Sequence, residues 1–389
     1  MHRLGKALFL GLIAATLCAP AIGQLTLGSF PQQDNRALAP SPSAPHNVTD
    51  LLSWPKRADA YLNDHFGFRR FLVRANTGLY WRALRESTVP SIVTGRNGRI
   101  FPSAGDVPSQ ELLSNCGAQW PESFIKQWAQ EAETALNRLI DVVPDIRIVV
   151  IPTSAVLYSD DLPRWIQRAC QDRQPIAADL ISRLPASIQS RSIFPLTRAQ
   201  NLPELLIPKE NFHWHGRGIS VLLGAYMERD LGILPDRTIP WTKKVSVSDL
   251  DGMLPGANLK NLTESPDLEK ANVTQCMGPR CIANSPLDGS VLPDTLFRVT
   301  AGGSNKRLLI LSDSFGYAAT EVLSAYFDDI INLNLNDFGR LPATDRANSW
   351  KALYKLWQPN QIIFLICDEN VGQISRMIDS FLPPVSSRP

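Results

Sequence analysis

Two residues of this chain, Ser314 and His213, have side chains suited to acyl-transfer chemistry. The apolar run at 307–311 has the composition of a buried strand, and it ends in Ser312-Asp313-Ser314-Phe315-Gly316. Serine nucleophiles often lie on strand-to-helix turns at the carboxyl edge of a sheet. A serine needs a base to take its proton, and Asn211-Phe212-His213-Trp214 supplies a histidine about a hundred residues upstream. The pair predicts acyl transfer at Ser314, with His213 as general base.

Each of these residues also has a simpler structural interpretation. Ser314 could cap the helix that follows it, and His213 could be a structural histidine packed by Trp214. A His213–His215 pair could bind a metal, but zinc needs at least a third ligand and the sequence nominates none, so we predict no metal and no other cofactor. Trp214 is a candidate for stacking on a sugar ring, although tryptophans are more often part of the core.

The remaining catalytic groups are less clear. A carboxylate is expected beside a catalytic histidine, to orient its ring, but the residue two before His213 is Asn211. Asparagine accepts a hydrogen bond without supplying charge, and loss of the carboxylate in such a triad slows the reaction by orders of magnitude. For an oxyanion hole we expect the amide of Ser314, with Asn334 or Asn336 as a side-chain donor. Both asparagines could equally be turn residues.

The elements that would position these side chains alternate between strands and helices. Apolar runs predict buried strands at 146–151, 307–311, 330–335 and 361–366. Helical patterns lie between them, at 124–139, 177–184, 218–231, 315–325 and 347–357. This alternation predicts an α/β fold whose mostly parallel sheet is covered on both faces.

Three further segments complete the expected organisation. A helical pattern covers 51–84, and a turn at 95–98 between two short apolar runs predicts a hairpin. The stretch at about 235–305 is rich in Pro, Gly, Asn and Asp, without periodicity, and we expect a long loop insertion there. We therefore predict one domain over 50–389, preceded by a flexible leader at 24–49.

The amino terminus has the layout of a secretory signal peptide. Basic residues precede an apolar run at 7–17, and small residues follow up to Gly23. We expect export, with a signal peptide at 1–23 or, alternatively, an uncleaved anchor. The net charge of +2 and the absence of a basic block argue against a nucleic-acid partner.

Export changes the interpretation of the cysteines, because disulfides form in oxidising compartments. Cys276 and Cys281 bracket a short loop, and we prefer a disulfide to zinc because the chain has no second close pair. By elimination, Cys116 and Cys170 form the second bridge. Cys367 lies in an apolar run and is expected to be a buried free thiol.

Several motifs, taken in order, resemble those of the SGNH hydrolase-like polysaccharide O-acetyltransferases of the alginate AlgJ/AlgX type. The similarity spans roughly residues 50–380. Each motif is short, but the motifs occur in the same order and at similar spacing as in the family. Asn211-Phe212-His213-Trp214 falls on the family's Asp-x-His-Trp motif, and Ser312 to Phe315 on its Gly-Asp-Ser-Phe motif. The segments that carry the rest of the resemblance are 60–69, 93–101, 151–163 and 359–369.

The resemblance implies a three-layer SGNH hydrolase-like sandwich in which the base precedes the nucleophile, a circular permutation of the usual esterase order. It implies a periplasmic acetyltransferase that acts on an exopolysaccharide through an acetyl-Ser314 intermediate. A membrane-bound O-acyltransferase is then a possible partner that supplies acetyl groups. The chain departs from the family at Asn211, Ser312, Ser154 and Asn370. The alternatives are a carbohydrate acetylesterase and a catalytically inactive member that binds polysaccharide or a partner.

Overall fold

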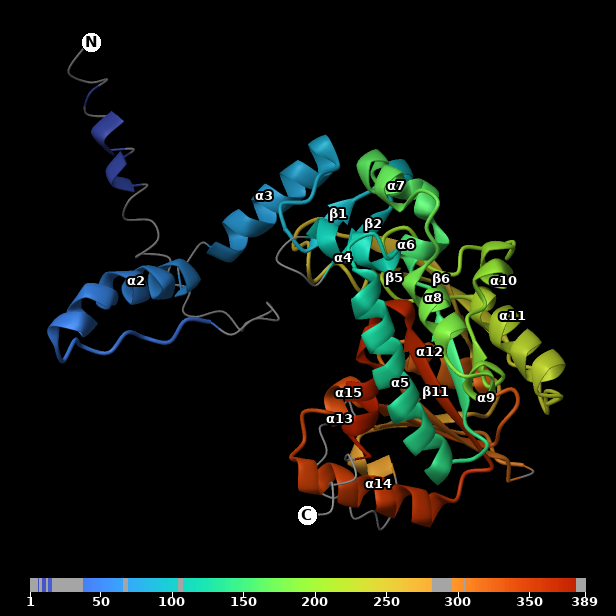
Figure 1. Ribbon diagram of the computed structural model, residues 1–389. Coiled ribbons are helices and arrows are strands. Elements are labelled where there is room, and N and C mark those ends of the chain that lie inside the picture. Colours follow the sequence, from blue (N-terminus) through green and yellow to red (C-terminus); the bar gives the residue numbers. More distant parts are fainter. Residues whose placement is uncertain are drawn as a thin grey trace. The chain divides into compact units, whose positions relative to one another are not determined.

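The computed structural model (Figure 1) describes residues 38–65, 69–103, 108–281, 296–303 and 305–382, together with residue 6 and the short helical stretches 9–11 and 13–15. Most of the expected signal peptide and the first part of the leader lie outside the described residues. Within the described part, no helix is both long and apolar enough to cross a membrane. The chain divides into two compact units, 1–90 with 249–259 and 91–248 with 260–389.

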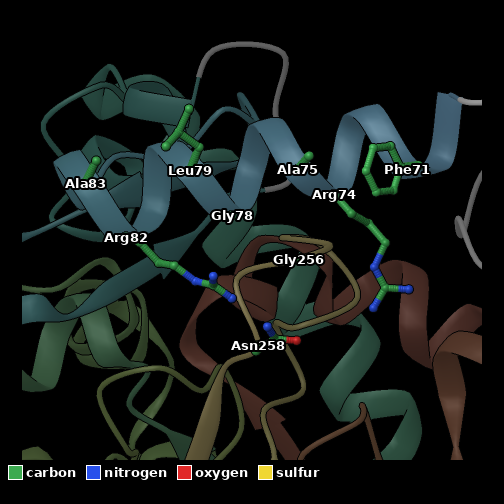
Figure 2. Close-up of a pocket in the computed structure, with 9 residues that line it drawn as sticks. All are labelled: Phe71, Arg74, Ala75, Gly78, Leu79, Arg82, Ala83, Gly256 and Asn258. Carbon is green, nitrogen blue, oxygen red and sulfur yellow. The ribbon is translucent and has the colours of Figure 1, made fainter.

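The first unit contains helices α2 (Val48–His65) and α3 (Arg69–Leu84) and the loop Asp249–Leu259. Figure 2 shows the loop passing under α3 at Gly78 and Gly256. The two backbones are so close that a Cβ on Gly78 would lie 2.8 Å from the Gly256 carbonyl oxygen. Gly256 also has φ +98°, where a side chain is strained. Glycine at both positions is therefore what permits this contact.

The second unit is built around a seven-stranded sheet in the order β4-β3-β11-β9-β10-β8-β7. The first five strands are parallel, and β8 and β7 add to one edge in antiparallel fashion. The strands are β3 (Arg147–Ile151), β4 (Ser192–Ile193), β7 (Thr274–Met277), β8 (Leu296–Thr300), β9 (Arg307–Ser312), β10 (Asp329–Asn334) and β11 (Gln361–Cys367). All four predicted buried strands are confirmed, and they lie side by side.

Helices cover both faces of this sheet (Figure 1). Successive side chains of a strand point to opposite faces: Leu309 packs in the core under one helix layer, and Leu308 and Ile310 in the core under the other. The first layer contains α5 (Glu122–Val142), α8 (Ile176–Arg183), α14 (Ala343–Trp357) and α15 (Ile374–Asp379), and the second contains α11 (Arg217–Ala225) and α12 (Gly316–Leu323). The α/β three-layer fold predicted from the sequence is therefore present.

Shorter elements connect these layers. The predicted hairpin is confirmed as the antiparallel pair β1 (Ile92–Thr94) and β2 (Ile100–Pro102). The remaining helices are α4 (Pro108–Asn115), α6 (Ser154–Leu157), α7 (Arg164–Cys170), α9 (Ala186–Gln189), α10 (Leu196–Gln200) and α13 (Leu335–Phe338). Tighter 3-10 helical turns lie at Arg96–Gly98, Ser159–Asp161, Pro279–Cys281 and Asp368–Gln373, and α11 continues into a wider π-helical turn at Tyr226–Asp230. Both predicted disulfides, Cys116–Cys170 and Cys276–Cys281, are present, and Cys367 is a buried free thiol.

The prediction for 235–305 is wrong in one respect, because this stretch is not a plain loop insertion. Its described part contains β7 and β8 of the main sheet and a separate antiparallel hairpin of β5 (Trp241–Val247) and β6 (Lys260–Pro266). Most side chains of this hairpin are exposed or half-buried. A strand that buries neither face has no apolar alternation in its sequence, which is why the pattern gave no strand signal.

Candidate active site

The carboxyl ends of two neighbouring parallel strands, β9 and β11, form the centre of the candidate site. Strand β9 ends at Ser312 and continues through the turn Ser312–Gly316, called here the serine turn, into α12. Strand β11 ends at Cys367 beside it, since Leu365 pairs with Ser312. Ligands of open α/β sheets bind at this edge. The sequence prediction that Ser314 stands at the carboxyl end of a buried strand matches its place in the structure.

His213 and Ser314 lie within hydrogen-bonding distance although they are far apart in the sequence. The imidazole Nε2 is 2.8 Å from the Ser314 hydroxyl oxygen, the separation expected of a base and its nucleophile. The Phe315 ring lies beside the imidazole, with ring centroids 5.1 Å apart. The Ser314 side chain is only half-buried. The Ser314 hydroxyl is therefore partly accessible, and the Phe315 ring provides an apolar surface beside the His213 imidazole.

The Asp313 carboxylate fixes the serine turn from inside the protein. It is completely buried, and its Oδ1 accepts a hydrogen bond from the amide of Phe315 at 3.0 Å. Its Oδ2 accepts two more, from the amide of Cys367 at 2.7 Å and from Nδ2 of Asn370 at 2.8 Å. The carboxylate thereby ties the turn to the end of β11. Asn370, one of the positions at which the chain departs from the motifs that it resembles, supplies one of these three donors.

The serine turn also depends on a glycine. A Cβ on Gly316 would lie 1.9 Å from the hydroxyl of Ser312 and 2.0 Å from Nδ2 of Asn332. These two side chains are buried and hydrogen-bonded to each other at 2.8 Å. The serine that replaces the motif's glycine at position 312 is thus accommodated, because Gly316 leaves room for its hydroxyl and Asn332 satisfies it.

The amide of Ser314, predicted as an oxyanion donor, lies just before helix α12. Within the described part of the chain, its N–H donates to no acceptor, and the amino terminus of α12 follows two residues later. The positive end of a helix dipole favours negative charge at this place. An oxygen that becomes negative on a substrate carbonyl would find a free donor here.

The two asparagines predicted as further oxyanion donors have other surroundings. Asn334 is buried at the end of β10 and caps α13, accepting from the amide of Asn336 at 3.1 Å. Its Nδ2 donates to the hydroxyl of Tyr317 and to Asp337, each at 3.1 Å. Asn336 itself is exposed. Asn334 therefore has its amide hydrogens directed at protein partners, as a structural turn residue would.

Of the two alternatives considered for Trp214, a sugar-stacking residue and the more common core residue, the structure has the core one, because the side chain is completely buried. Its indole Nε1 donates to the carbonyl oxygen of Phe315 at 2.9 Å, and the two rings pack with centroids 6.1 Å apart. Trp214 thus links the segment Asn211–Trp214, called here the histidine segment, to Phe315. This contact joins the residue after His213 to the residue after Ser314.

Asn211 does not orient His213 in this structure. Its carboxamide is buried, and Oδ1 accepts a hydrogen bond from Nδ2 of Asn261 in β6 at 2.6 Å. Among the described residues, this is the one hydrogen bond of the side chain, so no contact from Asn211 orients the imidazole. Asn211 instead connects the catalytic segment to the β5–β6 hairpin. The hairpin is reinforced nearby, since Ser248 Oγ donates to the carbonyl of Glu210.

A buried arginine that the sequence did not single out supports the same segment from the β1–β2 hairpin. Arg99 is 1 % exposed, pairs with Asp161 at 2.9 Å and donates to the carbonyl of Ile207 at 3.1 Å. Its guanidinium lies 3.6 Å from the ring centroid of Tyr158, whose hydroxyl accepts from the amide of Leu206 at 2.9 Å. Burial lowers the pKa of Arg99, and its bond to Asp161 opposes that shift. The network holds the chain just before His213.

Two buried groups at the end of β11 have displaced pKa values. Burial raises the pKa of the Asp368 carboxyl to about 7, the nearby Thr153 opposes that shift, and the nearby Asp313 charge adds to it. Burial likewise raises the pKa of the Cys367 thiol well above its usual range. The thiol is therefore protonated at neutral pH and is no competing nucleophile.

Among the described residues, no group of three or more His, Cys, Asp or Glu side chains could hold a metal ion.

Comparison with known proteins leaves the chain without an assigned family. No family model matches it, and no curated protein does either. Among solved structures it is similar to PatB1 of Bacillus cereus, with 14 % identity and a TM-score of 0.47 over 72 % of this chain and 96 % of that one. A DHHW family protein from Eubacterium siraeum shares 12 % identity, with a TM-score of 0.47 over 77 % of this chain and all of that one. The O-acetyltransferase domain of Pseudomonas putida AlgJ shares 12 % identity, with a TM-score of 0.45 over 75 % of this chain and all of that one. Likenesses this distant carry no conclusion about activity.

Proposed function

We propose that this protein is an O-acetyltransferase that moves an acetyl group onto a polysaccharide hydroxyl through an acetyl-Ser314 intermediate. The observation that carries the proposal is the 2.8 Å contact between His213 Nε2 and Ser314 Oγ at the carboxyl edge of the sheet. The free amide of Ser314 supports it. The motif order shared with the polysaccharide O-acetyltransferases points to acetyl as the group transferred and to a polysaccharide as the acceptor.

In the first half-reaction, Ser314 Oγ attacks the carbonyl carbon of an acetyl donor while its proton passes to His213 Nε2. The negative charge that develops on the carbonyl oxygen is stabilised by the Ser314 amide and the α12 amino terminus. The bond to the donor's leaving group then breaks, and His213 returns the proton to that group. Acetyl-Ser314 remains.

The second half-reaction repeats these steps with a new nucleophile. A sugar hydroxyl gives its proton to His213 Nε2 as its oxygen bonds to the acetyl carbon, and the bond to Ser314 Oγ breaks. The proton then returns to Ser314, which restores the enzyme. If water takes the place of the sugar, the product is acetate, which is the esterase reaction. The same residues serve both, so the nature of the acceptor separates the two activities.

The proposed cellular setting is the periplasm. The signal-like amino terminus supports export, and the two disulfides are the bonds expected of an exported protein. An acetyl donor must reach this compartment, and a membrane-bound O-acyltransferase is the proposed supplier.

The test is intact-mass spectrometry after incubation with p-nitrophenyl acetate. We expect the wild-type protein to gain about 42 Da, one acetyl group on the nucleophile, and Ser314→Ala to gain nothing. Ser159→Ala, at an exposed serine, is the matched control and should acetylate normally. If the wild type neither gains this mass nor releases acetate, the protein is not an acyl-transfer enzyme, and the binding-protein alternative replaces this proposal.

A second test addresses the uncharged residue of the motif. Asn211 accepts a hydrogen bond from Asn261 and makes none with His213. Asn211→Asp should therefore leave the rate of acetyl-Ser314 formation within about threefold of the wild-type rate, as expected for a residue that does not orient the histidine. A rise of about a hundredfold or more would show that the position does orient the imidazole, since that is the scale on which a triad carboxylate acts.

A further inference from the structure

A cavity of about 580 Å³ opens beside the histidine segment in the second unit. Its walls come from two places, the chain that flanks His213 and the β5–β6 hairpin. They comprise Glu204, Leu205, Pro208, Lys209, His215, Gly216, Lys243, Asn261, Leu262, Thr263 and Glu264. Cavities of roughly 300–1,000 Å³ are typical of small-ligand sites. This one is large enough for more than one sugar unit.

The cavity is connected to the candidate catalytic residues by a short path. His215 lines it and follows His213 by two residues, so the two Cα atoms are at most about 7 Å apart. On the opposite wall, Asn261 donates the 2.6 Å hydrogen bond to Asn211. Both walls are thus connected to the segment that carries His213, whose Nε2 is 2.8 Å from Ser314 Oγ.

The charges that line the cavity balance one another. Two lysines face two glutamates. Glu264 is paired with Lys243 at 3.1 Å and with Arg217 at 2.7 Å, and Lys209 donates to the carbonyl of Asn97 at 2.9 Å. The lining therefore offers no uncompensated cluster of cations that would attract an anionic polymer. It does offer many donors and acceptors at its surface.

Apolar surface is also present. Leu262 lines the cavity with 68 % of its side chain exposed, and Leu205 is exposed as well. Sugar rings combine hydroxyl groups with apolar C–H faces, and sites with a few polar groups among apolar ones orient such ligands. Charge balance, hydrogen-bonding groups and exposed leucines together match an uncharged sugar.

We infer that this cavity binds uncharged hexose units of the acceptor polysaccharide, next to the sugar that is acetylated. The inference rests on the proposed function and adds the substrate class and its subsite. Uronate polymers are disfavoured, because each carboxylate would have to compete with Glu204 and Glu264 for the few cations present.

The experiment separates acetyl-Ser314 formation from transfer. The protein is acetylated with p-nitrophenyl acetate, and loss of the acetyl group is followed by mass spectrometry with cellohexaose, chitohexaose or hexagalacturonate added. We expect cellohexaose or chitohexaose to accelerate the loss and to gain the acetyl group, and hexagalacturonate to do neither. Leu262→Glu should raise the KM for the uncharged oligosaccharide about tenfold relative to the wild type, a loss of about 1.4 kcal/mol of binding. The rate at which this variant forms acetyl-Ser314 is measured separately, so that the two effects are distinguished.

Val247→Glu is the matched control. It introduces the same charge on the same hairpin at a side chain that is 65 % exposed, and Val247 does not line the cavity. Its KM should equal that of the wild type. The inference is overturned if hexagalacturonate is the better acceptor, if no oligosaccharide of the three is acetylated, or if both glutamate variants behave alike. Failure of the wild type to form acetyl-Ser314 would instead refute the proposed function.

Discussion

The most direct test of how the serine turn is held is the change Asp313→Asn. It keeps the size of the side chain but replaces one acceptor oxygen with an amide group. The carboxylate receives three hydrogen bonds, one on Oδ1 from Phe315 and two on Oδ2 from Cys367 and Asn370. An asparagine keeps at most the two on one oxygen, and its amide then faces the donor of the third.

The cost follows from this count. A hydrogen bond to a charged group contributes about 1.5–3 kcal/mol, and a buried donor left without an acceptor costs about 1–3 kcal/mol. The asparagine no longer bears the desolvation of a buried charge, which offsets part of the loss. We expect the free energy of unfolding to fall by about 3 kcal/mol, the lower half of that combined range. Ser314 should also shift, slowing its acetylation by about a hundredfold.

The assay is urea denaturation at pH 7, with acetylation followed by mass spectrometry. Asp160→Asn, at an exposed aspartate, serves as control and should stay within about 0.5 kcal/mol. A cycle with Asn370→Ala isolates one donor, and we expect a coupling of about 1–2 kcal/mol between positions 313 and 370. Equal stability of Asp313→Asn and wild type, or a coupling near zero, would refute the view that the carboxylate fixes the turn.

Three other changes have expected outcomes. Gly316→Ala should lower the free energy of unfolding by about 1–3 kcal/mol, because its Cβ would lie 1.9 Å from Ser312 Oγ; Gly252→Ala, with no atom within 4 Å of the new Cβ, is the control, and equal losses would contradict the steric cause. The folded-state pKa of Asp368, about 7, lies above the ordinary 3.8, so ionisation costs the fold free energy. Stability should fall by up to about 4 kcal/mol between pH 4 and pH 7. Asp368→Asn should remove that decline, and a wild-type stability independent of pH over this range would count against it. Replacing Cys116 and Cys170 by serine opens a loop closed over a separation of 54 residues and should cost about 4 kcal/mol in chemical denaturation. A loss of under 1 kcal/mol would show that the bridge is not a stabilising one.

Much of the second unit is predictable because its strands are buried on both faces. Runs such as 361–366 have no polar interruption, and that pattern identifies a central parallel strand. The turn after β9 was predicted from the same logic, since a run of this kind that stops at small polar residues marks the carboxyl edge of the sheet. The β5–β6 hairpin has no such signal, because packing on neither face constrains its residue types.

The supporting contacts of the site were not predictable, because they join residues that the fold alone brings together. Asp313 reads as a turn residue or a solvated one from its neighbours, yet its acceptors serve donors 54 and 57 residues away. Trp214 follows the histidine in the motif, and its sequence left two alternatives open, a core residue and one that stacks on a sugar. Its actual partner is the carbonyl of Phe315, 101 residues further on. Local sequence nominates the candidate reacting groups, whereas the contacts that support them depend on the tertiary fold.

Asn211 shows why a motif residue and its role must be considered separately. An aspartate at this buried position would need enough donors to repay the loss of hydration of its charge, and the hydrogen-bond donor directed at it is the Asn261 amide. A neutral carboxamide satisfies that donor at lower cost. The position therefore serves the hairpin that forms one wall of the cavity. One hydrogen bond, from Asn261 to Asn211, thus joins this hairpin to the segment that precedes His213.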